Sequence, residues 1–322
     1  MNQNLNENLV GAIKSALPEK MNVALYLMDL LSLGKEAVYR RLRGTVSFNI
    51  EESALISKDL NISLDQIVGM KTTDKAIFNL NLIETANLMD GYCASMRSYI
   101  EAVKKIKPYA DSKWQSVCSS IPCTFYIQYD LISKFYLYKW VYQMRGFESP
   151  LKFAQFSIPQ YVLDVHEEFM CENRFLHTGC FILSRNIFIS LAKDIALFSR
   201  LNALSKVEAH QIKEELIELL SNLESIAASG TFGLDGDSDI SFYLSNIDFD
   251  SSYIHLECRD FELSIFKVFS YSSINSLKSE VCEVHKEWIN SLKRSSTLIS
   301  RSGDVHRAEY FNEQRELLNA IL

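Results

Sequence analysis

The first 70 residues are divided into short segments by strong helix-boundary signals. Proline and glycine, which are unfavourable inside helices, separate runs of apolar residues that recur with helical spacing. Two of the runs open with a capping-box pattern, at Asn49–Glu52 and at Ser63–Gln66. The segments are residues 6–17, 22–32, 34–44, 49–60 and 63–69. Five short helices in about 65 residues is the size of a small DNA-binding domain.

The stretch LLSLGKEAVYRRLRG, residues 30–44, fits the spacing of a helix-turn-helix. In that motif apolar residues surround a small turn residue, and the second helix buries aliphatic side chains one turn apart. The positions that match are Leu27, Leu31, Ser32, Leu33, Val38 and Leu42. The residues then left facing outward are Lys35, Glu36, Tyr39, Arg40 and Arg43, with Thr45 just beyond the helix. Such a face can contact phosphates and base edges, so these six are the candidate DNA-binding residues.

A basic run also occurs on the solvent-facing side of ordinary bundle helices, which is the simpler interpretation of YRRLR taken alone. Lys35–Arg43 carries a charge of +3, but residues 1–72 together hold as many acidic as basic side chains. Five capped segments in the expected order favour DNA binding. The neutral balance keeps a second class open, a protein-interaction module whose helix-turn-helix does not bind DNA.

The motif LSLGKEAVYRRLRG, followed by NIEESALISKDLNISLDQIVG, resembles the lambda-repressor-like (Xre/Cro-type) helix-turn-helix domain of long transcriptional regulators. The resemblance covers about residues 7–70, and GDVHRAEYFNEQRELLNAI near the C-terminus is similar to the ends of such regulators. It implies a five-helix domain in which the NIEE segment begins the fourth helix and NISLD leads into the fifth. Two positions depart from the family pattern: Ser32 stands where glycine is usual, and Met28 where a small residue is usual.

The remaining chain is expected to be mostly helical, because the protein contains only five prolines and none follows Pro159. Helices are expected at about 75–106, 123–144, 160–200, 205–228, 273–296 and 304–321. Runs rich in β-forming residues at about 240–270 predict a small antiparallel meander. The predicted fold class is therefore mainly α, with a DNA-binding domain at 1–72 and a larger helical sensing or oligomerisation domain at 73–322.

Charge and composition exclude several classes. The net charge of −7 is carried entirely beyond residue 72, which argues against a protein that coats nucleic acid non-specifically. The start, MNQNLNENLV, lacks the features of a signal peptide. Three charged residues interrupt the apolar run 180–198, which favours a buried helix over a membrane span. The seven cysteines form no C-x-x-C pair, so free thiols in a reducing cytoplasm are expected.

One segment contains metal-ligand residue types: His166, Glu167, Cys171, His177 and Cys180. His177 and Cys180 would share one face of a helix, but their spacing matches no zinc motif. A buried helix with incidental thiols is the favoured interpretation.

The segment DGDSDISFYLSN begins like a calcium-binding loop, with Asp235, Asp237 and Asp239. Ile240 and Asn246 stand where such a loop needs glycine and glutamate, so a polar turn is favoured. The sequence contains no P-loop, dinucleotide-binding loop or nucleophile elbow. No enzyme, catalytic residue, cofactor or metal is therefore predicted.

The sequence thus predicts a cytoplasmic transcriptional regulator that binds a double-stranded DNA operator as a homodimer joined through residues beyond 73. The size of the acidic remainder suggests that it also couples an effector, a small molecule or a protein, to DNA binding. The aromatic stretch 125–142 would line the effector pocket, although core packing is the more frequent use of such residues. An enzyme built on the C-terminal region is a weaker alternative.

Overall fold

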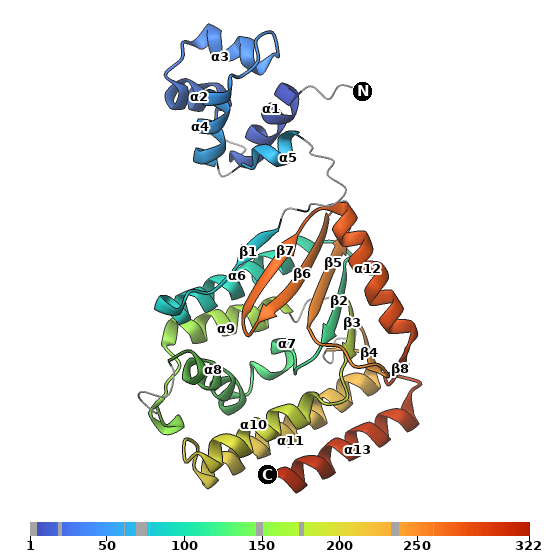
Figure 1. Ribbon diagram of the computed structural model, residues 1–322. Helices are drawn as coiled ribbons and strands as arrows, with labels where there is room; N and C mark the ends of the chain where they lie inside the picture. The colour runs from blue at the N-terminus through green and yellow to red at the C-terminus, as the bar shows by residue number, and fades with distance from the viewer. Residues whose placement is uncertain are drawn as a thin grey trace. The chain divides into compact units, whose positions relative to one another are not determined.

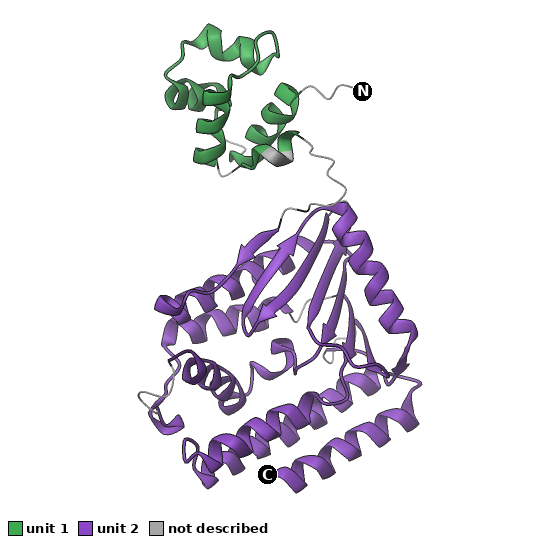
Figure 2. Ribbon diagram, viewed as in Figure 1, with its two compact units in different colours: residues 1–77 green, residues 78–322 purple. Residues whose placement is uncertain are grey.

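The computed structural model describes residues 5–18, 21–60, 62–68, 76, 78–145, 151–173, 177–232, 238–259 and 261–322. The chain divides into two compact units, unit 1 (residues 1–77) and unit 2 (residues 78–322), which Figure 2 shows in different colours. The division predicted from the sequence falls at residues 72/73. Each unit has hydrophobic clusters made of its own residues.

Unit 1 consists of short helices whose ends follow the local signals. The helices are α1 (Leu5–Ala16), α2 (Val23–Leu31), α3 (Lys35–Leu42), α4 (Ile50–Leu60) and α5 (Leu64–Val68). The capping box at Asn49 and Glu52 is formed, because the backbone N–H of each residue donates to the side chain of the other, at 3.0 and 2.8 Å. The side chain of Gln66, on which the second box depends, lies outside the described residues. The centre of the core consists of Leu9, Ile13, Leu27, Val38 and Ile56.

Unit 2 is built on an eight-stranded mixed sheet with the order β1-β7-β6-β5-β2-β3-β4-β8. The strands are β1 (Asn79–Asn81), β2 (Lys113–Cys118), β3 (Thr178–Leu183), β4 (Asp239–Ser245), β5 (Tyr253–Cys258), β6 (Phe261–Phe269), β7 (Ser272–Ser276) and β8 (Ser296–Leu298). The β2–β3 and β3–β4 pairs are parallel, and the remaining pairs are antiparallel.

Helices cover both faces of this sheet (Figure 1). They are α6 (Leu88–Ile106), α7 (Cys123–Tyr126), α8 (Asp130–Arg145), α9 (Gln160–Asn173), α10 (Ile187–Arg200), α11 (Lys206–Ser229), α12 (Ser279–Arg294) and α13 (Asp304–Ile321), with two short 3-10 turns at Thr85–Asn87 and Phe153–Gln155. Val117 and Ile182 pack against Ile289 of α12 on one face. The alternate strand residues, such as Phe181, face the main core, to which α6, α7, α8, α10, α11 and α13 contribute.

The expectation of a mainly α fold with a small antiparallel meander is therefore wrong, and the protein is α/β. The three runs of the predicted meander form β4, β5 and β6, but only β5 and β6 are antiparallel neighbours. Strand β4 instead pairs in parallel with β3 and antiparallel with β8. Strands β1 and β7 lie in the segments at about 75–106 and 273–296 that were expected to be helical. Strands β2 and β3 were not expected either. Both are short and almost fully buried, and a strand covered on both faces shows no apolar–polar alternation that distinguishes it from a buried helix.

The apolar run 180–198, expected to be one buried helix, is divided between the end of β3 and most of α10. The two elements are separated by residues 184–186. Across the described part of the chain, no helix combines the length and apolar character needed to cross a membrane.

Most of the aromatic stretch 125–142 packs in the core of unit 2. Phe135, Tyr138 and Trp140 of α8 are buried, and the Tyr138 hydroxyl donates to the backbone carbonyl of Leu151 at 2.6 Å. Phe125 packs edge-on to Phe181 of β3, with ring centroids 4.9 Å apart. Core packing is thus the main use of these residues.

Candidate nucleic-acid interface

The turn between α2 and α3 accommodates both departures from the family pattern. Ser32 has φ +52° and ψ +39°, a left-handed conformation that glycine adopts more readily. The backbone N–H of Leu33 donates to the carbonyl of Met28 at 3.3 Å and closes the end of α2. Met28 itself is only partly buried at the edge of the unit 1 core, so its larger side chain does not have to fit between the helices.

Helix α3 presents most of the predicted residues to solvent. Val38 is fully buried on its inner face. The exposed residues are Lys35, Glu36, Arg40, Arg43 and Thr45. Tyr39 differs from the prediction, because its side chain is half-buried against the core of unit 1. The Nζ atom of Lys35 and the Cζ atom of Arg43 lie 6.0 and 5.8 Å from the centre of the Tyr39 ring, so this ring lies close to two of the exposed cations.

Arg41 is not part of the outward face. Its Nε and Nη2 atoms donate to the two carboxylate oxygens of Glu52 at 2.8 and 2.7 Å, and Nη1 donates to the carbonyl of Ala37 at 3.2 Å. The two side chains are only 15% and 12% exposed. The hydrogen bonds from Arg41 hold the pKa of the Glu52 carboxyl below its usual range. This bidentate pair joins α3 to the start of α4.

Asn6 of α1 fixes the loop that follows α3. Its amide Nδ2 donates to the carbonyl of Arg41 at 2.9 Å, and its Oδ1 accepts from the backbone N–H of Phe48 at 3.0 Å. Gly44, with φ +76°, makes the turn between these two contacts. The sequence alone does not identify Asn6 or Glu52 as supports of α3, because their contacts with α3 and its loop span 11 to 42 residues.

The outward face of α3 is therefore cationic. Glu52 neutralises Arg41, which leaves the exposed Lys35, Arg40 and Arg43 against the single acid Glu36. These three cations can approach phosphates without breaking an internal ion pair. Arg41, in contrast, would first have to leave Glu52.

The structure separates the residues considered as zinc ligands. His166 is buried on α9 and hydrogen-bonds the Tyr92 hydroxyl at 2.8 Å, and Cys171 is exposed on the same helix. His177 and Cys180 do not share a helical face, because this segment is strand β3 and the residue before it. Cys180 packs under α12. All seven cysteines are free thiols.

Of the residues considered as a calcium loop, Asp235 and Asp237 lie outside the described residues. Asp239 begins β4 and forms an ion pair with Arg301 at 2.8 Å.

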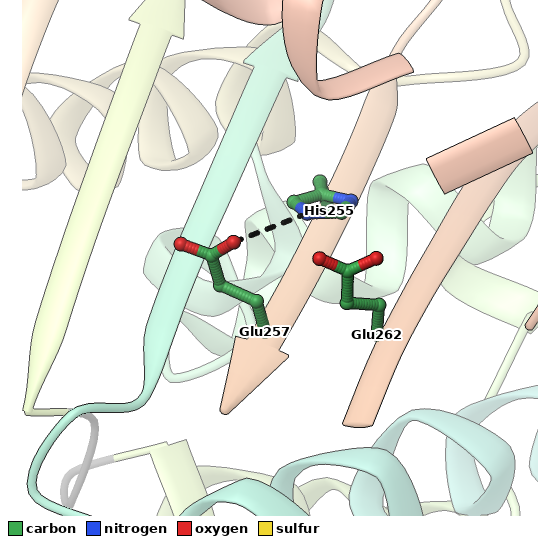
Figure 3. A group of neighbouring side chains, drawn as sticks. All are labelled: His255, Glu257 and Glu262. Carbon is green, nitrogen blue, oxygen red and sulfur yellow. Dashed lines mark ion pairs between the residues drawn. The ribbon is translucent and has the colours of Figure 1, made fainter. Parts of the chain in front are cut away.

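Under α12, the hairpin β5–β6 brings together three residues that could bind a metal and that belong to no motif in the sequence. His255, Glu257 and Glu262 have donor atoms within 4.8 Å of one another, and Figure 3 shows the two carboxylates near the imidazole. Lys113 and Lys286 both form ion pairs with Glu257. Because these lysines already neutralise the carboxylate, we assign the cluster a structural role that balances charge.

Two buried histidines, His255 of β5 and His285 of α12, lie close to each other beside this cluster. The Nδ1 atoms of His255 and His285 lie 3.3 and 2.9 Å from the Ser264 hydroxyl. Burial lowers the pKa of His285 to about 4, and it also lowers the pKa of His255. Both imidazoles are therefore neutral at pH 7.

We predict that unit 2 loses stability in mild acid. Since the pKa of His285 is about 4 in the folded state and about 6.5 in the unfolded state, the unfolded chain binds the proton first as the pH falls below about 6.5. This single group should lower the free energy of unfolding by about 3 kcal/mol between pH 7 and pH 4. All three tryptophans lie in unit 2, so denaturant titrations followed by tryptophan fluorescence measure it.

The matched test compares His285→Gln with His210→Gln, a change at an exposed histidine. His285→Gln should flatten the pH dependence, and His210→Gln should leave it unchanged. Some slope will remain in either variant, because burial also lowers the pKa of His166 to about 4. Equal slopes in the two variants would show that His285 is not responsible.

Comparisons with models of known protein families, with curated proteins and with solved structures give no match for this chain.

Proposed function

We propose that the protein is a cytoplasmic, sequence-specific DNA-binding transcriptional regulator, and that α3 is its recognition helix. The observation that carries the proposal is the exposed cationic face of α3, held in a fixed orientation by the Arg41–Glu52 pair and Asn6. A helix supported in this way enters the major groove with little further ordering of its backbone.

The exposed residues divide into two roles. Arg40 and Arg43, on the second half of α3 and at its end, are assigned to phosphates, where a cation contributes affinity without sequence preference. Lys35 and Glu36, in the first turn, are assigned to base edges, because the N-terminal residues of a recognition helix reach the bases. Tyr39 supports the cations beside it. Thr45, just beyond the helix, is assigned to the DNA backbone, to which its hydroxyl can donate a hydrogen bond.

The alternative is a protein-interaction module that does not bind DNA. Two exposed apolar side chains in unit 1 favour it: Leu25 of α2 is 62% exposed and Ile50 of α4 is 83% exposed. The neutral charge balance of residues 1–72 is also compatible with it.

Selection of random double-stranded DNA by the full-length protein distinguishes the two functions. The proposal expects an enriched sequence whose affinity falls steeply with salt, because binding releases counterions from the phosphates. Failure to enrich any sequence, together with weak binding that does not depend on salt, would favour the interaction module.

We also propose that the regulator binds DNA as a homodimer joined through unit 2. A single helix-turn-helix covers one half-site, and two of them about 34 Å apart give useful specificity. A segment comprising residues 1–77, which contains its own core, should bind the selected DNA at least about 100-fold more weakly than the full chain. Sedimentation analysis should find a dimer of the full chain at micromolar concentration. A monomer with undiminished affinity would contradict this proposal.

A further inference from the structure

Unit 2 contains a partly enclosed pocket on the face of the sheet opposite α12. It lies between α6, the carboxyl end of β2 with the segment that follows it, and the strands β5 and β6. Its free volume is about 50 Å³, several times the roughly 10–15 Å³ that one water molecule needs. Much of the lining is aromatic, with Trp114, Tyr126 and Tyr271 among its residues.

Lys267 of β6 lines this pocket and forms no ion pair with a described residue. Within the described residues, no carboxylate lies within ion-pair distance of its ammonium group, although most other half-buried lysines of unit 2 have such a partner. The neighbouring groups are also neutral. Burial raises the pKa of the Cys118 thiol to about 12 and raises the pKa of Tyr126 well above its usual value. A cation next to an apolar cavity is costly unless an anion accompanies it.

A second polar group bordering the pocket also lacks a partner. Trp114 of β2 is only 3% exposed, and its Nε1–H has no acceptor among the residues that the structure describes. Buried indole N–H groups normally donate a hydrogen bond. The pocket thus combines an unpaired cation, an unused donor and aromatic walls, which is the usual composition of a site for a small organic ligand.

We propose that this pocket binds a small organic anion, a carboxylate or phosphate ester on a compact apolar stem. The anionic group pairs with Lys267, and the stem lies against Tyr126 and Tyr271. The sequence alone does not reveal this site, because its residues come from α6, β2, β5, β6 and the segments between them. The assignment does not depend on DNA binding.

Titrations of the full chain in the absence of DNA test the site, with tryptophan fluorescence and calorimetry as readouts. The probes are acetate and butyrate, their neutral counterparts acetamide and butyramide, and methyl phosphate. At least one anion should bind about tenfold or more tightly than its neutral counterpart. Comparison of acetate with methyl phosphate identifies which anionic group the site prefers.

Two variants test whether Lys267 causes the preference for the anion over its neutral counterpart. Lys267→Met should reduce the preference for the anion to less than about twofold and leave the thermal midpoint of the protein unchanged or higher. Lys206→Met, at an exposed lysine of α11 outside the pocket, should retain the full preference. The proposal is wrong if none of the anions binds below about 10 mM, or if Lys267→Met binds them as well as the unmodified protein does.

Discussion

Replacement of Arg41 with alanine is expected to lower the free energy of unfolding of unit 1 by about 3 kcal/mol. The change removes a bidentate ion pair and leaves the Glu52 carboxylate in a site where it is only 12% exposed. The cost is larger than that of losing a surface ion pair, because the remaining carboxylate keeps only the Asn49 N–H as a hydrogen-bond donor and has little access to water. We expect hydrogen exchange of residues 35–60 in the full chain to accelerate by about two orders of magnitude.

Arg40→Ala is the matched control, because it removes the same side chain from the preceding, exposed position of α3. It should change the stability by less than about 0.5 kcal/mol. A second control is the double variant Arg41→Met with Glu52→Gln. Glutamine keeps the cap on Asn49, and the pair no longer contains a buried charge, so much of the stability should return. Equal effects of Arg41→Ala and Arg40→Ala would show that the ion pair does not stabilise the unit.

The double variant Arg40→Ala with Arg43→Ala is expected to bind the selected DNA about 50-fold more weakly at 0.1 M salt. Each phosphate contact contributes about 0.9 to the slope of log affinity against log salt concentration, so the loss of two contacts should lower the slope by nearly 2. The stability of unit 1 should be almost unchanged, since neither guanidinium forms an ion pair with a described residue. Binding titrations at several salt concentrations measure both quantities.

The control for this experiment is Lys14→Ala with Lys58→Ala, which removes the same charge from exposed positions on α1 and α4. A similar loss of affinity in both double variants would mean that unit 1 attracts DNA through its overall charge. An unchanged slope in the arginine variant would mean that α3 does not face the phosphates. The two arginine experiments also distinguish residues that hold α3 in place from residues that contact DNA. Arg41→Ala should change the stability of unit 1, whereas Arg40→Ala with Arg43→Ala should change its affinity for DNA.

Local sequence signals fixed the helices of unit 1. Capping at Asn22 and Asn49 and the breaks at Gly34 and Gly44 act within a few residues of the chain, so they determine where helices begin and end before any tertiary contact forms. The buried positions Leu27 and Val38 follow from the same helical periodicity. The role of Arg41 does not, because the helical period alone does not show that its guanidinium reaches a carboxylate 11 residues away.

In unit 2 the tertiary structure decided the fold. The parallel neighbours of β3 are β2 and β4, each separated from it by about 55 residues or more, and no local signal specifies such a pairing. The strand TGCFIL carries the same kind of apolar residues as a buried helix, and KWQSVC is short and half polar with no regular alternation, so neither is recognisable as a strand before it packs in the sheet. The Lys267 ammonium and the Trp114 N–H can be recognised as unpaired groups only in the folded unit, because an unsatisfied cation or donor is costly only where it is shielded from water.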